Sequence, residues 1–343
     1  MFYPLALRNF PVILSGGLKK DNILKRQNFG FSRRRFLTFG SLGTLGVAGA
    51  WAGWSQQSSA RLLRALIAET RRPVLKPKFT PSPHLWDPNS VTAAWLGHST
   101  VLVNFFGLTI LTDPVLGKRV GAETLFGTVG AKRLVEPALR PKQMPQIDLV
   151  LLSHAHMDHL DPISLRALPG RPRAVTAHAT TDLLTDAGLR AAESLRWGEK
   201  TLVRTAHGEV QISAFEVNHW GARWKVDRYR GYNGYIFERE GKKLIFGGDT
   251  AMTASFRTLR TLGPFDLAIM PIGAYQPWIQ SHCTPEQAVR MTNQAGANYL
   301  LPVHFKTFAF GRERTDEPIT RLEAALEPGR IGWREVGQTF KLC

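Results

Sequence analysis

The sequence predicts an α/β fold in which helices cover the faces of β-sheets. Two patterns predict this class: short apolar runs follow one another from residue 91 on, bounded by Gly, Pro or Asp, and helix-start signals fall between them. With 43% hydrophobic residues over 343 positions, the chain can bury a large core and lacks the bias of collagen, coiled coils or disordered proteins. Two cysteines exclude a disulfide scaffold and a thiolate-rich metal cluster.

The apolar runs are predicted as strands by their length and β-branched content. They are Thr92–Leu96, Val101–Phe105, Leu108–Thr112, Ile147–Ser153, Val210–Val217, Tyr235–Glu238, Lys243–Phe246, Leu267–Pro271 and Tyr299–Val303. A helix over Ile163–Leu168 is expected after the capping residue Asp161. A second begins with the capping-box spacing at Thr284 and stops at Gly296, and a third covers Glu317–Leu326.

The first 60 residues are expected to form an export signal. Residues 1–35 hold eight basic side chains and one acidic one, and Ser32–Leu37 (Ser-Arg-Arg-Arg-Phe-Leu) resembles the twin-arginine signal of bacteria. The uncharged stretch behind it is rich in glycine and less apolar than a permanent membrane span. We therefore expect export to the periplasm through the twin-arginine machinery, with an uncleaved inner-membrane anchor as the alternative. Residues 61–90 are expected to be a linker, and residues 91–343 the folded domain.

The net charge of +17, from 44 basic and 27 acidic residues, is partly explained by this signal. Charge in a signal is no evidence for a nucleic-acid partner, and we see no RNA-binding module. The remaining positive charge lies in the linker and the folded domain and suits peripheral association with an anionic membrane. The oligomeric state is left open by the sequence.

A cluster of metal-ligand residues follows one apolar run directly. Alternation in an extended chain points His154, His156 and Asp158 to one side, and a turn lets His159 join from another direction. Imidazole and carboxylate are ligands that zinc, iron and manganese accept. Four candidates exceed the needs of one tetrahedral centre with an open position. The spacing therefore predicts two metals, one held by the first two histidines and the other by the remaining pair.

Each metal needs further ligands, which we expect at the ends of other strands. His219, Asp249 and His304 each follow an apolar run directly. A lone histidine or aspartate at a strand end is weak evidence, because most such residues only pack or face solvent. Three of them in a chain that already holds the cluster indicate a shared site.

The order His-x-His-x-Asp-His, then His, Gly-Asp-Thr and His, resembles the metallo-β-lactamase superfamily over residues 91–327. Further segments resemble the branch that contains the N-acyl-phosphatidylethanolamine-hydrolysing phospholipase D and its bacterial relatives, with ascorbate-phosphate lactonases as a more distant branch. These segments are Trp95–Thr100, Leu111–Pro114, Pro271–Tyr275 and Val303–Phe308. Met157 and Gly231–Gly234 depart from the pattern of the lipase-like members, which leaves the particular lipid open.

The resemblance implies an αβ/βα four-layer sandwich of two β-sheets with helices outside and a hydrolase domain over residues 91–343. It implies two metal sites that share a bridging Asp249: His154, His156, His219 and Asp249 for the first metal, and Asp158, His159, Asp249 and His304 for the second. Asp113 would orient a ligand. Asp158, Asp249 and His282 are the expected catalytic residues, with an ordinary loop histidine as the alternative for His282. His98 is left between an orienting and a structural role.

The expected reaction is attack by a hydroxide bound to two metals on phosphorus or an acyl carbon. No protein nucleophile is needed, because no Gly-x-Ser-x-Gly elbow is present and Cys283 is expected to pack. We expect a phospholipase D-like phosphodiesterase acting on N-acyl phospholipids or related phosphate esters. A lactonase or other carboxylic-ester hydrolase on the same site is the alternative. Zinc is the expected ion, with iron and manganese open.

Two further alternatives concern the segment beside the site and the activity itself. The basic and aromatic segment Trp220–Tyr235 could hold a phosphate and an apolar tail at the mouth of the site, or be a solvated loop. A binding protein that has lost catalysis but kept the fold is disfavoured by the complete ligand set.

Overall fold

A computed structural model describes residues 69–342 of the chain, except residues 126 and 190. The expected export signal, residues 1–60, lies outside the described residues. The described part of the expected linker contacts the folded domain: the Leu75 amide donates to the Leu134 carbonyl at 2.9 Å, and Lys78 pairs with Glu335 at 2.7 Å. Within residues 69–342, no helix combines the length and apolar character needed to cross a bilayer.

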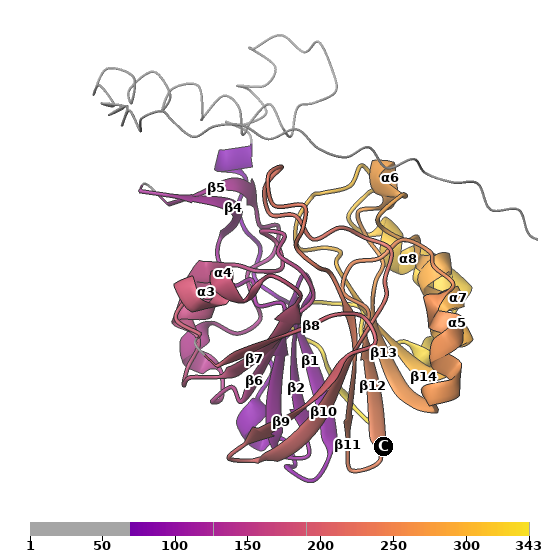
Figure 1. The fold of residues 1–343 in the computed structure, drawn as a ribbon. Coiled ribbons are helices and arrows are strands. Elements are labelled where there is room, and N and C mark those ends of the chain that lie inside the picture. Colours follow the sequence, from indigo (N-terminus) through magenta and orange to yellow (C-terminus); the bar gives the residue numbers. More distant parts are fainter. Residues whose placement is uncertain (1–68, 126, 190, 343) are drawn as a thin grey trace, which may run out of the picture. The chain divides into compact units, whose positions relative to one another are not determined.

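Two β-sheets form the centre of the fold (Figure 1). The first contains, in spatial order, β15 (Thr339–Lys341), β1 (Val91–Gly97), β2 (Thr100–Phe105), β3 (Leu108–Thr112), β6 (Leu149–Leu152), β7 (Arg173–Ala177) and β8 (Ala192–Leu195). The second contains β14 (Ala297–Val303), β13 (Phe265–Pro271), β12 (Lys242–Phe246), β11 (Gly234–Arg239), β10 (Gly208–Phe215) and β9 (Lys200–Thr205). A separate hairpin joins β4 (Arg119–Thr124) to β5 (Gly127–Lys132).

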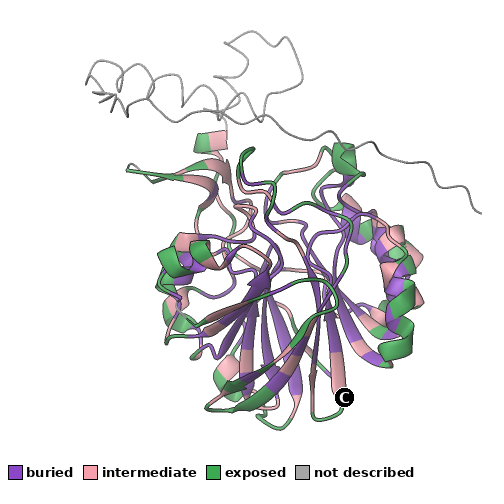
Figure 2. Ribbon diagram, in the orientation of Figure 1, coloured by how far each residue is buried: buried purple, intermediate pink, exposed green. Residues whose placement is uncertain are grey.

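Helices cover the outer faces of the sheets, so the architecture is the expected αβ/βα sandwich. On the side of the first sheet lie α3 (Pro162–Ala167) and α4 (Thr181–Asp186); on the side of the second lie α5 (Ser255–Leu259), α7 (Pro285–Ala295) and α8 (Glu317–Ala325) (Figure 1). The remaining short elements are α6 (Tyr275–Trp278) and the 3₁₀ turns η1 (Pro83–Leu85), η2 (Pro141–Gln143), η3 (Arg260–Leu262) and η4 (Pro328–Arg330). In Figure 2 the strands are mostly buried and the outer helix faces exposed.

Local sequence explains the elements that support the site. All residues of β6 are buried, as its uninterrupted apolar run predicts for a central strand with cover on both faces. Asp161 caps α3 by accepting a hydrogen bond from the Ser164 amide at 3.2 Å. Thr284 and Gln287 form the expected capping box of α7, and Gly296 ends that helix in the left-handed conformation. Every predicted strand and helix is present, within two residues at each end.

The strand directions bring the carboxyl ends of several strands to one edge. In the first sheet β3, β6 and β7 are parallel, and in the second β12, β13 and β14 are parallel. Strand β10 is antiparallel to β11, which is antiparallel to β12, so β10 runs the same way as β12. Residues that directly follow these strands therefore gather at the same end of the sandwich.

Candidate metal centre

The seven predicted ligands gather at this end, from segments far apart in the sequence. The cluster at residues 154–159 follows β6, and the other three residues follow three strands of the second sheet: His219 after β10, Asp249 after β12 and His304 after β14. His156 and Asp158 keep partial exposure, whereas the other five are buried. The centre thus joins both sheets and opens to solvent on one side.

A first group of donor atoms comes from three histidines. His154 Nε2 lies 2.8 Å from His156 Nδ1, and His219 Nε2 lies 3.2 Å from the same nitrogen. These three side chains form one of the sets that could hold a metal ion. The structure therefore brings together the three imidazoles that were expected at the first metal.

A second group combines two carboxylates with two histidines. His159 Nε2 lies 3.0 Å from Asp249 Oδ2 and 3.6 Å from Asp158 Oδ2. His304 Nε2 lies 3.2 Å from Asp249 Oδ2 and 3.6 Å from Asp158 Oδ2. All four residues expected at the second metal are therefore neighbours.

Asp249 stands between the two groups. Its Oδ2 atom is 3.8 Å from His219 Nε2 of the first group, besides its short distances to His159 and His304 of the second. This is the placement required of a carboxylate that bridges two ions. The side chain is 2% exposed, so its position is set by the surrounding protein.

Hydrogen bonds behind the histidines fix which nitrogen faces the centre. Ser153 donates its hydroxyl to Asp113 Oδ2 at 2.5 Å and lies 2.9 Å from His154 Nδ1. Asp113 Oδ2 also lies 2.6 Å from His159 Nδ1, and His219 Nδ1 donates to the Ser281 carbonyl at 2.9 Å. These partners leave the Nε2 atoms free toward the centre, as ligand-supporting contacts do in metal sites.

Backbone strain is also present at the centre. Asp113, His98 and His304 have φ values of 32°, 53° and 64°, in the left-handed region that residues other than glycine rarely adopt. Such conformations cost about 1–3 kcal/mol each and persist where the surrounding structure enforces them. The strained residues are thus ones that carry donor atoms or contact them.

The donor atoms fit metal ions because several of them are buried without a hydrogen-bond partner. Among the described residues, the orphaned atoms include His159 Nε2, both ring nitrogens of His304, Asp249 Oδ1 and His282 Nδ1. An unpaired buried polar atom costs about 1–3 kcal/mol, and native proteins rarely keep several together. Metal ions would satisfy those that face the centre.

The electrostatics of the chain also fit cations. Burial, followed by the charge of neighbouring histidines, lowers the pKa of His154 well below its ordinary value, which favours the neutral, metal-binding form. Burial alone would raise the pKa of Asp249, but His159 and His304 hold it well below the usual range. Burial would lower the pKa of His304, yet Asp249 and Asp158 raise it to about 9. The carboxylates of Asp249 and Asp158 therefore favour positive charge in the centre.

His98 contacts the centre through Asp158, one of the predicted ligands. Its Nε2 lies 3.0 Å from Asp158 Oδ2, and its ring packs 4.1 Å from that of His304. The side chain is 1% exposed, so it cannot meet substrate from solvent. Of the two roles left open by the sequence, this geometry supports orientation of Asp158.

His282 faces the centre, and its neighbour Cys283 does not. His282 Nδ1 lies 3.9 Å from Asp249 Oδ2, and burial lowers the pKa of the imidazole to about 4, so the ring is neutral near pH 7. Cys283 is fully buried, and its thiol donates to the Pro271 carbonyl at 3.2 Å. Burial also raises the pKa of this thiol, which opposes thiolate chemistry.

A groove of about 680 Å³ adjoins the first group of donors. It is lined by aromatic and basic side chains and by small residues of one loop: Trp220, Gly221, Ala222, Arg223, Trp224, Lys225, Arg228 and Tyr232. The Trp220 ring lies 4.5 Å from that of His219 and 4.7 Å from that of His156. The groove therefore leads to two of the predicted ligands, His156 and His219.

Sequence reasoning missed the supporting residues Ser153 and Ser281. Ser153 lies between the end of β6 and His154, and this adjacency is the one signal that could have singled it out. Ser281 contributes a backbone carbonyl, whose role is independent of its side chain. No residue pattern could have revealed the latter contact.

Comparisons with known proteins show relatives in sequence and in structure. Residues 109–305 match the family described as the Beta-lactamase superfamily domain. An uncharacterised protein of Mycobacterium tuberculosis is 33% identical over 270 residues, which cover 74% of this chain and 69% of that protein. The N-acyl-phosphatidylethanolamine-hydrolyzing phospholipase D 1 of Caenorhabditis elegans is 29% identical over 250 residues, which cover 68% of this chain and 69% of that protein.

A solved structure shares the fold. Igni18, a metallo hydrolase of the archaeon Ignicoccus hospitalis, superposes with a TM-score of 0.56 at 23% identity, over 74% of this chain and 98% of that protein. At this identity the likeness concerns the arrangement of the sheets and helices.

Proposed function

Because the chain belongs to the beta-lactamase superfamily and is a metal-dependent hydrolase of that superfamily, we propose that it is a phospholipase D-like phosphodiesterase acting on N-acyl phospholipids or related phosphate esters. The observation that carries the proposal is the shared position of Asp249 Oδ2 between two donor groups, beside a basic and aromatic groove. The name of the worm relative supports the choice of substrate class.

The donor chemistry supports two divalent ions. His154, His156 and His219 would hold the first, and Asp158, His159 and His304 the second, with Asp249 serving both. Imidazole with carboxylate suits zinc, which we propose as the ion, while iron and manganese accept the same donors. When bound, two such ions acidify water and stabilise negative charge on phosphate or carbonyl oxygens.

The chain's own side chains would orient the substrate and exclude water. The unpartnered Nδ1 of His282 faces Asp249 and is available to hydrogen-bond a substrate oxygen. The Trp220 indole closes the side of the centre next to His156 and His219 and would exclude water there. Buried Cys283 offers no competing nucleophile.

The test is an assay of the purified, metal-loaded protein on N-acyl-phosphatidylethanolamine, with release of phosphatidic acid as the readout. Lactone opening is measured in parallel, because a carboxylic-ester hydrolase could use the same centre. Release of phosphatidic acid that the Asp249→Asn variant lacks supports the proposal. Lactone opening without any phosphatidic acid release would replace it with the lactonase alternative.

We also propose that residues 1–60 direct the protein to the periplasm through the twin-arginine machinery. The support is the basic Ser32–Leu37 segment and the weakly apolar stretch behind it. Replacing Arg33, Arg34 and Arg35 by lysine should leave the protein in the cytoplasmic fraction. Unchanged periplasmic recovery of that variant would contradict this route.

A further inference from the structure

The loop at residues 220–232, called here the mouth loop, is held by an ion-pair network around the buried Arg230. Asp227 accepts hydrogen bonds from the Trp224 amide at 2.7 Å and from Arg230 Nε at 2.8 Å. Arg230 also donates to both carboxylate oxygens of Asp182, at 2.6 and 2.8 Å. Asp227 and Arg230 are buried, so the ion pair between them is shielded from solvent within the loop.

Further contacts fasten the loop to the metal-binding edge. Arg223 donates to the Leu160 carbonyl at 2.7 Å and to the Ala155 carbonyl at 3.2 Å, beside the cluster that follows β6. At the neck of the loop the backbone passes so closely that a Cβ on Gly221 would lie 2.2 Å from the Gly231 carbonyl oxygen. The mouth loop is therefore fixed before any partner arrives.

This fixed loop presents large apolar side chains to solvent. Val226 is 88% exposed, Tyr229 65% and Trp224 48%. Between them stand exposed Lys225 and Arg228, while the loop's carboxylate, Asp227, is already paired with Arg230. An exposed patch of apolar side chains that is rimmed by cationic ones marks a surface that another molecule or a membrane covers.

Two other segments of the fold also present apolar side chains to solvent. Trp278 and Ile279, 51% and 40% exposed, lie just before Ser281, whose carbonyl accepts from His219. Leu125, at the tip of the β4–β5 hairpin, is fully exposed. The hairpin and α6 both lie at the upper end of the fold in Figure 1.

We propose that the mouth loop is a docking surface for an anionic lipid bilayer, which seats the groove beside His219 on the headgroup layer. Tyrosine and tryptophan favour the membrane–water interface, where the ring is apolar and its polar edge stays wet. Lysine and arginine near an anionic leaflet strengthen binding by roughly fivefold each. The identity of the lipid that is hydrolysed rests on the proposed function. The docking itself rests on the mouth loop alone.

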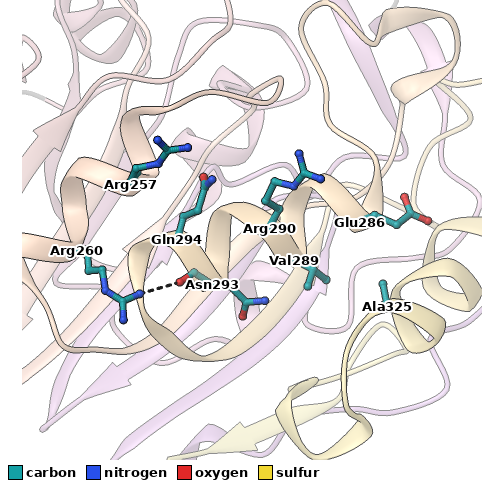
Figure 3. Close-up of a pocket in the computed structure, with 8 residues that line it drawn as sticks. All are labelled: Arg257, Arg260, Glu286, Val289, Arg290, Asn293, Gln294 and Ala325. Carbon is teal, nitrogen blue, oxygen red and sulfur yellow. Dashed lines mark hydrogen bonds between the residues drawn. The ribbon is translucent and has the colours of Figure 1, made fainter.

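A second basic cluster on the molecule lacks this combination and serves as a contrast. Three arginines line a groove between α5 and α7, on the outer side of the second sheet: Arg257, Arg260 and Arg290 (Figure 3). Figure 3 shows Arg257 and Arg290 pointing the same way, with Arg260 bonded to Asn293. The groove has no exposed aromatic residue among its lining residues. Positive charge without exposed aromatic side chains should give weak, non-specific lipid binding.

The experiment measures co-sedimentation of the full chain with vesicles of phosphatidylcholine alone and of phosphatidylcholine with phosphatidylglycerol. The variant V226D/Y229D should bind the anionic vesicles at least about tenfold more weakly, because two apolar side chains no longer enter the interface. Its hydrolysis of a short-chain N-acyl phospholipid, dissolved as monomers, should stay at the parent rate, since neither residue lines the groove.

Two control variants distinguish a loss of docking from the general effect of changing a surface charge or an exposed apolar residue. L85D places the same carboxylate on another exposed apolar residue, 76% exposed in η1, and R290E alters the contrasting basic cluster. Both should bind vesicles like the parent. Parent-like binding of V226D/Y229D, or an equal loss in R290E, would overturn the docking proposal. Loop-dependent binding without any phospholipid hydrolysis would instead leave docking standing and remove the proposed function.

Discussion

At the scale of single residues, Asp249 is the side chain on which both donor groups depend. Asp249→Asn should keep the fold, because the amide has the shape of the carboxylate, but should remove the charge that faces His159, His219 and His304. We expect activity to fall by more than the roughly 10–100-fold typical of losing an orienting contact behind a ligand. Hydrolysis rate and bound metal per chain, with circular dichroism for folding, measure this. A fully active variant would show that Asp249 is not a ligand.

His98 allows a second test at this scale, since it touches the centre only through other residues. His98→Ala should lower metal affinity about 10–100-fold by releasing the Asp158 carboxylate. His98→Gln, which can still donate to Asp158, should recover part of that affinity.

The chain offers a matched control for His98. His207 Nδ1 lies 2.8 Å from Asp148, a similar imidazole–carboxylate pair whose histidine is half exposed and outside the centre. His207→Ala should leave metal affinity unchanged in the same titration with a metal indicator. Equal losses in both alanine variants would mean that the effect is structural and that His98 does not position Asp158.

The sequence indicated the candidate ligands better than the residues that support them. His154, Asp249 and His304 each stand where an apolar strand ends, which is visible in one dimension. The orienting contacts of Ser153 and the Ser281 carbonyl depend on segments that meet only in the folded chain. Distances between strands of different sheets are not encoded in any local pattern. The shared role of Asp249 was therefore expected from resemblance alone, and the structure adds its distances to both donor groups.

At the scale of elements, the turn after β12 sets the position of Asp249. Gly248 has a φ of 56°, and a Cβ there would lie 2.7 Å from Ser153 Cβ and 3.0 Å from the Asn233 carbonyl oxygen. Gly248→Ala should therefore push the β12 turn away from β6 and separate Asp249 from His159. Lower metal content and a lower free energy of unfolding in urea are expected.

Gly241, in the turn between β11 and β12, is the matched control for Gly248. It has a φ of 72° but nothing within 4 Å of the position of a Cβ. Gly241→Ala should therefore show only the conformational cost of a left-handed alanine, about 1–2 kcal/mol, with normal metal content. If both variants lose the same stability and keep their metal, steric contact at the β12 turn is unimportant.

Several of the elements that sequence patterns missed share a physical cause. The β4–β5 hairpin mixes small, charged and glycine residues and is largely exposed, so it shows no apolar alternation. Strand β8 has four residues and only Leu195 fully buried, and α5 is a single short helix of five residues. Elements that contribute little to the core leave a weak hydrophobic signature, whereas β6 and β13 could be predicted from their buried runs.

At the scale of the whole molecule, the proposed metal content is a measurable property. Elemental analysis of the purified protein should find two equivalents of zinc, iron or manganese per chain. Substantially less than two equivalents after metal loading would contradict the dinuclear assignment.

Removal of the ions should also destabilise the fold. Free ion at 100 times its Kd stabilises the native state by about 2.7 kcal/mol per site, so a chelator should lower Tm and added metal should restore it. His207→Ala, outside the centre, should show the same metal-dependent shift as the parent. A Tm that does not respond to chelation would show that the donor groups hold no ion with useful affinity.

The placement of the donors on both sheets has a consequence for the unfolded chain. Ions held by residues after β6, β10, β12 and β14 would tie together positions from His154 to His304, and so close a loop of about 150 residues. In a chain with two cysteines, one of them buried as a free thiol, such ties would do the work of a disulfide cross-link. Loss of metal would then separate the two sheets from each other before either sheet unfolds.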